Sequence, residues 1–177
     1  MRRLLRYPVA LLASLPAVVA MSAPSEYQLK LDLFPKFTRF IEWPGQSSVR
    51  NLYAPFTLGV IGQSPFGDDL DRYFLKQLLK GKSVQVRYCR TLEDLDSCDL
   101  VFICASEKDR LKPILARVRQ RPILTVSDTP GFAKAGVMVS FLREGNRLAF
   151  EVNVATAKEA GIQFASNFLQ VVHVVAS

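Results

Sequence analysis

The chain has 177 residues, of which 49% are hydrophobic and 22% are charged, a composition that predicts one globular domain and excludes a disordered or fibrous chain. The net charge is +7, but Arg2, Arg3 and Arg6 all lie near the start, and without them 20 basic and 16 acidic residues leave +4. These charges are interspersed and form no basic run, so we expect no nucleic-acid partner.

The first segment, MRRLLRYPVALLASLPAVVAMSAP, has a basic start, an apolar stretch and small residues before Pro24. This is the layout of a secretory signal peptide. We predict a signal peptide over residues 1–20, with cleavage after Ala20 or as late as Ala23, and a single domain over residues 24–177. An uncleaved anchor is the alternative, although the apolar stretch is shorter than the roughly 20 residues that span a bilayer.

After this segment, helical and strand patterns alternate. A capping box formed by Ser25 and Gln28, followed by apolar residues at helical spacing, predicts a helix that Pro35 kinks or breaks. Short apolar runs predict strands at 56–62, 84–88, 99–104 and 123–126. Helical segments are expected at 68–80 and 106–119, with one or two turns at 91–95. This alternation favours parallel pairing with helices on both faces.

The pattern changes in the last third of the chain. The segment VMVSFLREGNRLAFEVN predicts two strands joined in a hairpin at residues 144–146. Asn153 is expected to cap a helix that Gly161 ends, and a last helix is expected over 166–175. The predicted fold class is an α/β three-layer sandwich: a mostly parallel central sheet with a C-terminal antiparallel hairpin and helices on both faces.

Two loops follow predicted strands at the edge where α/β proteins usually bind ligands, and they contain Gly62, Ser127 and Asp128. Ser127 and Asp128 are adjacent, so they point in different directions and cannot form a charge relay by themselves. The single histidine, His173, lies in an apolar segment, where we expect no catalytic role. We therefore predict no enzyme and interpret the second loop as a structural turn. A small-molecule site in the crevice beyond Gly62 and Asp128 is the alternative, and a hydrolase is a weaker one.

No metal or cofactor site is expected either, because the cysteines at 89, 98 and 104 have no histidine near them. The end of the first predicted helix carries three aromatic residues close together, Phe37, Phe40 and Trp43. One helix end does not normally bury so many rings. Packing in the core is nevertheless the interpretation we prefer for these rings. A contact surface for a protein partner is the alternative, which makes the three rings our candidate partner-binding residues.

Five segments occur in an order that resembles the YfiR-like family of exported bacterial proteins, from about Glu26 to Val175. They are EYQLKLDLFPKFTRFIEWP, FTLGVIGQSPFGDDL, CDLVFICASE, PILTVSDTPGFAKAGVMVSF and LAFEVNVATAKEAGIQFASNFLQV. The resemblance implies a periplasmic regulator that binds the periplasmic domain of an inner-membrane diguanylate cyclase and holds the enzyme inactive. It also implies an OmpA-like outer-membrane lipoprotein as a second partner, and control of cyclic-di-GMP signalling, biofilm formation and motility.

The resemblance does not decide everything. A periplasmic small-molecule receptor of an unrelated signalling or transport system stays open as a different class of function, and so does a homodimer. The chain also departs from the family pattern: Pro35 interrupts the first helix, Gly59 replaces a cysteine of the first strand, and Asp99 replaces a histidine.

The family pattern also bears on the cysteines. Relatives often link the first-strand cysteine to the one at position 98, which favours a 2-1-3 strand order. Here Gly59 removes that pairing. Cys98 and Cys104 bracket one strand and lie roughly 20 Å apart, too far for a bridge. In this strand order Cys89 and Cys98 lie toward opposite ends of the sheet, and the first strand separates Cys89 from Cys104. We therefore expect no disulfide, unless RTLEDLDS folds back and brings Cys89 to Cys98.

The N-terminal pattern generates a prediction about export. We expect protein recovered from the periplasm to begin after Ala20 or Ala23, because the signal peptidase selects small residues at these positions. N-terminal sequencing checks this. A chain that still begins at Met1 in the membrane fraction would reject the signal peptide.

Overall fold

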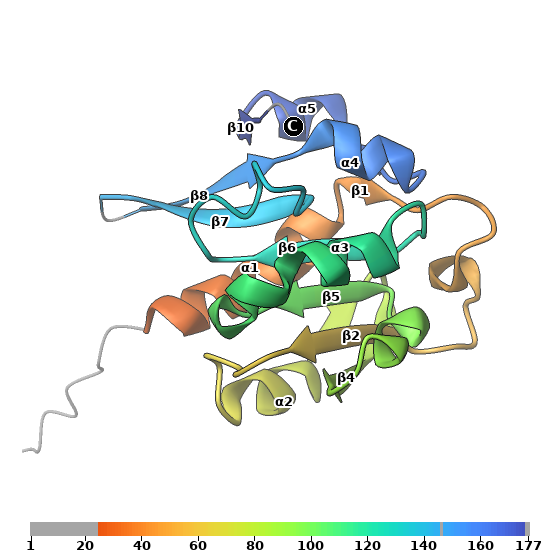
Figure 1. The fold of residues 1–177 in the computed structure, drawn as a ribbon. Helices are drawn as coiled ribbons and strands as arrows, with labels where there is room; N and C mark the ends of the chain where they lie inside the picture. Colours follow the sequence, from red (N-terminus) through yellow and green to blue (C-terminus); the bar gives the residue numbers. More distant parts are fainter. Residues whose placement is uncertain (1–24, 146, 176–177) are drawn as a thin grey trace, which may run out of the picture.

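The computed structural model describes residues 25–145 and 147–175 (Figure 1). The predicted signal peptide lies outside the described residues. The helices are α1 (Glu26–Thr38), α2 (Asp69–Phe74), α3 (Leu111–Val118), α4 (Val154–Glu159) and α5 (Ser166–Leu169), with 3-10 turns η1 (Ser48–Arg50), η2 (Glu93–Ser97) and η3 (Ala105–Arg110). The strands are β1 (Ile41–Glu42), β2 (Phe56–Ile61), β3 (Leu78–Leu79), β4 (Lys82–Cys89), β5 (Leu100–Ile103), β6 (Leu124–Ser127), β7 (Val139–Glu144), β8 (Arg147–Val152), β9 (Gln163–Phe164) and β10 (His173–Val174).

The main sheet has eight strands in the order β10-β8-β7-β6-β5-β2-β4-β3. Strands β4, β2, β5, β6 and β7 are parallel neighbours, whereas β7 and β8 form the predicted antiparallel hairpin. The first three long strands along the chain, β2, β4 and β5, lie in the order β4-β2-β5, so the predicted 2-1-3 order is confirmed. Strands β1 and β9 form a separate antiparallel pair.

Helices cover both faces of the sheet, as predicted, and two groups of buried side chains lie between the layers. On one face, α1 and α2 pack on the strands through Leu31, Phe34 and Leu70. On the other face, η2 and α3 pack through residues such as Leu95 and Ile114. Figure 1 shows α3 in front of the sheet and α1 behind it. The fold is therefore a mixed α/β sandwich.

Phe34 is the centre of the larger core. It is 0% exposed and lies among five other rings. Its ring centroid is 5.5 Å from that of Phe37, 5.7 Å from Phe141, 6.1 Å from Phe74, and 6.4 Å from both Phe66 and Phe102. These rings come from α1, from α2 and the loop before it, and from strands β5 and β7, so one side chain joins the helical layer to the middle of the sheet.

Helix α1 begins with the expected capping box and continues through Pro35 to Thr38. The helix is not broken at Pro35. A proline inside a helix removes one backbone hydrogen bond, here to the carbonyl of Leu31. Phe34 and Phe37 on either side of the proline are both buried in the core, and this packing holds the helix together across the lost bond.

Two predicted helices are wrong in part. The helix expected at 68–80 ends at Phe74, and β3 follows and turns into β4 through Lys80 and Gly81, whose φ values of 53° and 76° suit a tight hairpin turn. The helix expected at 166–175 ends at Leu169. Its last part forms β10 beside β8, since β-branched residues such as Val172 and Val174 favour strands.

The helix expected from Ser106 to Arg119 begins later, because the 3-10 turn η3 precedes α3. Pro113 lies in the first turn of α3, where backbone N–H groups have no partner within the helix, so the proline is tolerated there. Ser106 does not cap the helix. Its hydroxyl accepts a hydrogen bond from the Gln63 backbone N–H instead, at 2.8 Å.

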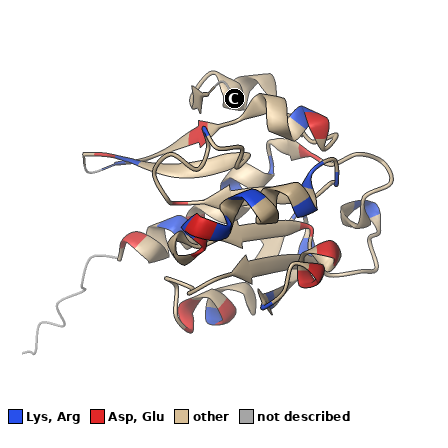
Figure 2. Cartoon of the chain, in the orientation of Figure 1, with Lys and Arg blue, Asp and Glu red and all other residues tan. Residues whose placement is uncertain are grey.

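Among residues 25–145 and 147–175, no helix is long and apolar enough to cross a membrane. In the view of Figure 2, lysine and arginine alternate with aspartate and glutamate around the fold, as the sequence indicates.

The aromatic core predicts a large cost for truncating Phe34. We expect Phe34→Ala to lower the free energy of unfolding by about 3–5 kcal/mol, because it leaves a cavity among packed rings. Tyr53, which is 99% exposed, provides a matched aromatic control, and Tyr53→Ala should change stability by less than about 0.5 kcal/mol. Denaturant unfolding measures both values. Similar values for the two variants would contradict the central role of Phe34.

Candidate functional site

Gly62, in the loop after β2, packs closely against the start of η3. Gly62 has a φ of 96°. A Cβ atom at this position would collide with the Ser106 hydroxyl and would lie 2.8 Å from Cγ of Glu107. Gly62 therefore allows the start of η3 to pack directly against the end of β2, because any larger residue at this position would collide with η3.

Ser127, at the end of β6, is 0% exposed and both of its hydrogen-bonding roles are used. Its hydroxyl donates to the Ile103 carbonyl at 2.7 Å and accepts from the Thr129 backbone N–H at 3.2 Å. The first bond joins β6 to β5, and the second begins the turn that follows. These contacts support the interpretation of this loop as a structural turn.

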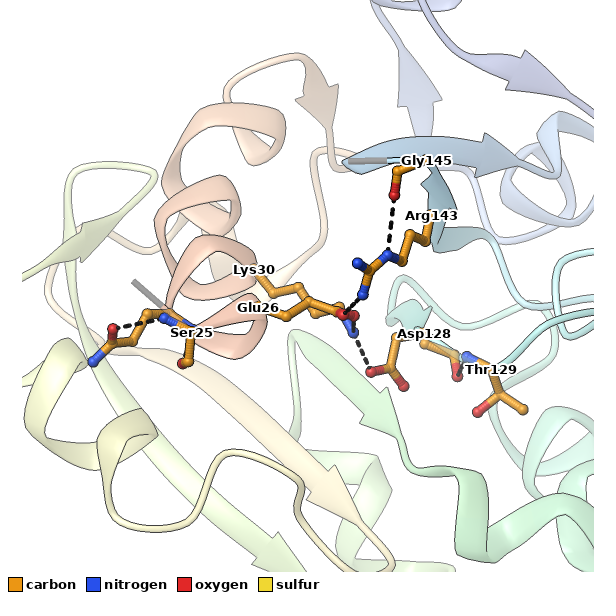
Figure 3. A network of polar contacts seen from close by, with 9 residues as sticks. Ser25, Glu26, Lys30, Asp128, Thr129, Arg143 and Gly145 are labelled. Atoms are coloured by element: carbon orange, nitrogen blue, oxygen red, sulfur yellow. Dashed lines mark hydrogen bonds and ion pairs between the residues drawn. The ribbon is translucent and has the colours of Figure 1, made fainter. Parts of the chain in front are cut away.

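Asp128 takes part in an ion pair with helix α1. Its Oδ2 atom lies 2.7 Å from Nζ of Lys30, and the two side chains are only 9% and 5% exposed. Lys30 also lies 2.7 Å from a carboxylate oxygen of Glu26, and Arg143 on β7 binds the other oxygen of Glu26 at 2.8 Å. Figure 3 shows these four side chains converging between α1, the loop after β6 and the hairpin. We call Glu26, Lys30, Asp128 and Arg143 the polar network.

The polar network shifts the pKa values of its members. Burial alone lowers the pKa of Lys30, but the hydrogen bonds to Asp128 and Glu26 outweigh it and raise this pKa above its ordinary value. The hydrogen bond from Lys30 lowers the pKa of Glu26, even though partial burial opposes the shift.

The two shifts act at opposite ends of the pH scale. Because the pKa of Glu26 is depressed, its stabilising contribution is present above about pH 4.3 and is lost as pH falls through the folded-state value. Because the pKa of Lys30 is raised, its contribution is present below about pH 10.4 and is lost at higher pH. Glu26 and Lys30 therefore both keep their charge throughout the neutral range. The ion pairs of the network join three segments of the chain.

Phe37 and Trp43 lie in the core, which is the interpretation that the sequence favoured for these rings. They are 1% and 4% exposed, and Nε1 of Trp43 donates to the Asp99 carbonyl at 3.3 Å. Phe40 differs, because it is 37% exposed and stacks on Phe168 with ring centroids 5.5 Å apart. Of the three rings, only Phe40 reaches the surface.

Two further apolar side chains are exposed in the segment that follows Phe168 along the chain. Val171 follows α5 and is 76% exposed, and Val174 on β10 is 55% exposed. We call Phe40, Val171 and Val174 the C-terminal patch. The valines were assigned to a helix because they stand in an apolar run, whereas their β-branching was the signal for an edge strand. His173 lies between them and binds a carboxylate oxygen of Glu144 at 2.7 Å.

All three cysteines are free and buried. The expected separation of Cys89 and Cys98 toward opposite ends of the sheet is wrong, because their sulfur atoms lie 3.9 Å apart. The segment between them folds back over the sheet, the exception that the sequence analysis had allowed. Within the described part of the chain, no group of three or more His, Cys, Asp or Glu side chains could hold a metal ion.

The polar network generates a prediction about stability. We expect Lys30→Met to lower the free energy of unfolding by about 3–5 kcal/mol, because Asp128 then stays buried without a cation. Lys36 is an exposed lysine on the same helix, and Lys36→Met should cost less than about 0.5 kcal/mol. Adding Asp128→Asn to Lys30→Met should recover part of the loss. Denaturant unfolding at pH 7 measures all three variants, and equal effects of the two lysine substitutions would contradict the prediction.

Solved structures of other proteins have a similar fold. A domain from Streptococcus pneumoniae, solved as an "ABC domain in complex with L-Trp", is similar with a TM-score of 0.54 and 11% identity over 82% of this chain. A conserved domain protein from Vibrio cholerae is similar with a TM-score of 0.52 and 10% identity over 68% of this chain. The chain covers only 59% and 54% of these two structures. At such identities the likeness concerns the fold alone.

No curated protein matches the chain. The model of one protein family, DUF4154, described as YfiR/HmsC-like, matches residues 27–173. This match begins in α1 and ends in β10, so it includes the polar network except for Glu26, and all of the C-terminal patch except Val174. The chain therefore belongs to the YfiR/HmsC-like family.

Proposed function

We propose that this chain is a periplasmic regulatory protein that binds the periplasmic domain of an inner-membrane diguanylate cyclase and holds the enzyme inactive. Such binding lowers cyclic-di-GMP signalling and restrains biofilm formation. The observation that carries the proposal is the family match over residues 27–173. The best understood members of this family are periplasmic regulators. An OmpA-like outer-membrane lipoprotein that sequesters the chain would relieve this inhibition.

The chemistry at the carboxyl ends of the strands supports a binding protein over an enzyme. The Ser127 hydroxyl is used by two backbone groups, and the Asp128 carboxylate is paired with Lys30. A nucleophile needs a neighbouring base that takes its proton. Here each polar side chain of the expected crevice holds a segment of the fold in position.

The C-terminal patch supports a protein contact. Phe40, Val171 and Val174 present apolar area close to the outer end of the sheet, where β10 is the last strand. The outer side of an edge strand has backbone groups that can pair with a strand of another chain. An aromatic ring beside such an edge is a common anchor in protein interfaces. We therefore place the cyclase contact on this patch.

A second candidate function, reception of a small molecule, is favoured by one cavity in a different place from the expected crevice. It has a volume of about 360 Å³ and lies between α3, α4 and the loop before β7, with Leu115 and Met138 among its lining residues. This volume falls within the range of about 300–1,000 Å³ that is typical of ligand sites. L-Trp, the ligand of the similar Streptococcus pneumoniae domain, is a suitable first probe. Binding that Leu115→Trp abolishes would favour this function.

The proposed contact predicts the effect of one surface substitution. We expect Val171→Asp to weaken capture of the cyclase's periplasmic domain by at least about tenfold, because it places a charge in an apolar contact. The mutant should also raise cyclic-di-GMP in cells, as deletion of the gene should. Titration of the purified domain, from a cyclase encoded beside this chain, measures the affinity.

Leu52 provides the control, because it is 83% exposed and lies outside the C-terminal patch. Leu52→Asp should leave both affinity and cyclic-di-GMP unchanged. Equal weakening by the two substitutions, or by neither, would remove the contact from this patch. If Val171→Asp instead converts a dimer to a monomer, the patch joins two copies of the chain.

A further inference from the structure

Cys89 and Cys98 lie side by side on one face of the sheet. Cys89 ends β4, and Cys98 directly follows η2. Their sulfur atoms are 3.9 Å apart, and the two residues are 6% and 4% exposed. Strand β2 lies between β4 and β5, so the sulfurs meet above β2 and not between neighbouring strands.

Gly59 on β2 makes this meeting possible. A Cβ atom at this position would lie 2.6 Å from the sulfur of Cys98 and 3.2 Å from the sulfur of Cys89. Real Cβ atoms do not approach a sulfur as closely as the first of these distances. The two sulfurs therefore occupy the space that any other side chain at position 59 would fill.

The turn that brings Cys98 over β2 is fixed by polar contacts at both ends. The Asp94 carboxylate accepts hydrogen bonds from the backbone N–H groups of Arg90 and Thr91, both at 2.9 Å. Asp96 forms ion pairs with Arg117 and Arg121, which fasten η2 to α3 and the segment after it. Cys98 is thus held in place above Gly59 by the structure around it.

We propose that Cys89 and Cys98 form an intramolecular disulfide when the chain folds in an oxidising compartment. The proposal rests on export of the chain, which is part of the proposed function. It concerns a bond that the sequence analysis did not expect, because the premise that kept these two cysteines apart is wrong. Disulfides persist in the periplasm, where thiol–disulfide oxidoreductases supply the oxidant.

The reaction consumes one disulfide of such an oxidoreductase. The Cys89 thiolate attacks that disulfide and forms a mixed disulfide, and one sulfur of the oxidoreductase leaves as a thiolate. The Cys98 thiolate then attacks the Cys89 sulfur and releases the second sulfur of the oxidoreductase. Two electrons pass to the oxidant, which becomes a dithiol. The two protons lost by Cys89 and Cys98 balance those that it takes up. Both cysteines are buried in the finished fold, so the exchange takes place while η2 is docking.

The local electrostatics agree with this order of attack. The hydrogen bond between the two thiols lowers the pKa of Cys89 and raises that of Cys98, which makes Cys89 the first thiolate. Cys104 takes no part, because it packs in the core on the opposite face of the sheet. Burial and the nearby Asp128 and Glu107 raise the pKa of Cys104 to about 12, so it stays a thiol.

Thiol counting tests the bond. The full chain is exported in a bacterial host, its thiols are alkylated during denaturation, and the protein is digested and mapped. We expect one alkylated cysteine, Cys104, and a linked peptide pair containing Cys89 and Cys98. Cys104→Ser should show no free thiol, whereas Cys89→Ser and Cys98→Ser should each show two. Closing so short a loop should also raise the melting temperature by about 5–10 °C relative to reduced protein.

Two glycines provide a matched pair of variants. Gly59→Ala places a methyl group against both sulfurs and should reduce the linked fraction at least about tenfold. Gly45→Ala has no atom within 4 Å of the new methyl group and should form the bond as the natural chain does. Circular dichroism checks that both variants fold. A folded Gly59→Ala that links its cysteines normally would overturn the role of Gly59.

A second experiment tests whether the disulfide can form, independently of whether the chain is exported. Purified, reduced chain is incubated with oxidised glutathione at neutral pH and mapped in the same way. Three free thiols, a cross-linked dimer or glutathione left on Cys89 would overturn the proposal. If the bond forms here but not in cells, the pairing holds and export of the chain is refuted.

Discussion

The packing of Phe34 against five aromatic rings is the interaction on which the other features depend. It anchors α1 to the middle of the sheet, with rings from β5 and β7 on one side and from α2 on the other. The position of α1 then decides where Lys30 lies one turn earlier and where Phe40 lies after the helix ends. The packing of Phe34 therefore helps to place Lys30 in the polar network and Phe40 in the C-terminal patch.

The polar network determines how α1 is rotated about its own axis. Aromatic packing is tolerant of small rotations, whereas an ion pair in a largely buried place requires the two groups to meet. Lys30 meets Asp128 at 2.7 Å, and Glu26 connects the pair to Arg143 on the hairpin. Rotation of α1 would leave Asp128 buried without its cation. The network thus selects one orientation of the helix, even where its net contribution to stability is small.

Much of the fold followed from local patterns and from the family resemblance. The buried strands, the hairpin and the capping box at Ser25 were predictable because each has a short signal in the sequence. The helix expected at 166–175 was not, because an apolar run with valines can form a helix or an edge strand, and the pairing of β10 with β8 decides between them. For Phe37 and Trp43, spacing alone could not separate a core position from a surface one.

The cysteines show most clearly what strand order leaves undetermined. The order β4-β2-β5 was predicted, yet the sulfurs meet because η2 carries Cys98 back over the face of β2. The connection over residues 90–97 is too short to form a regular α-helix that packs on the sheet. Its position therefore depends on the contacts of Asp94 and Asp96 and on the space left by the missing side chain of Gly59. The two faces of β2 are consequently held in different ways. Aromatic rings cover one face, whereas on the other face the cover is a short turn that a covalent bond would fix. A glycine in the central strand is therefore what makes such a bond possible across three strands.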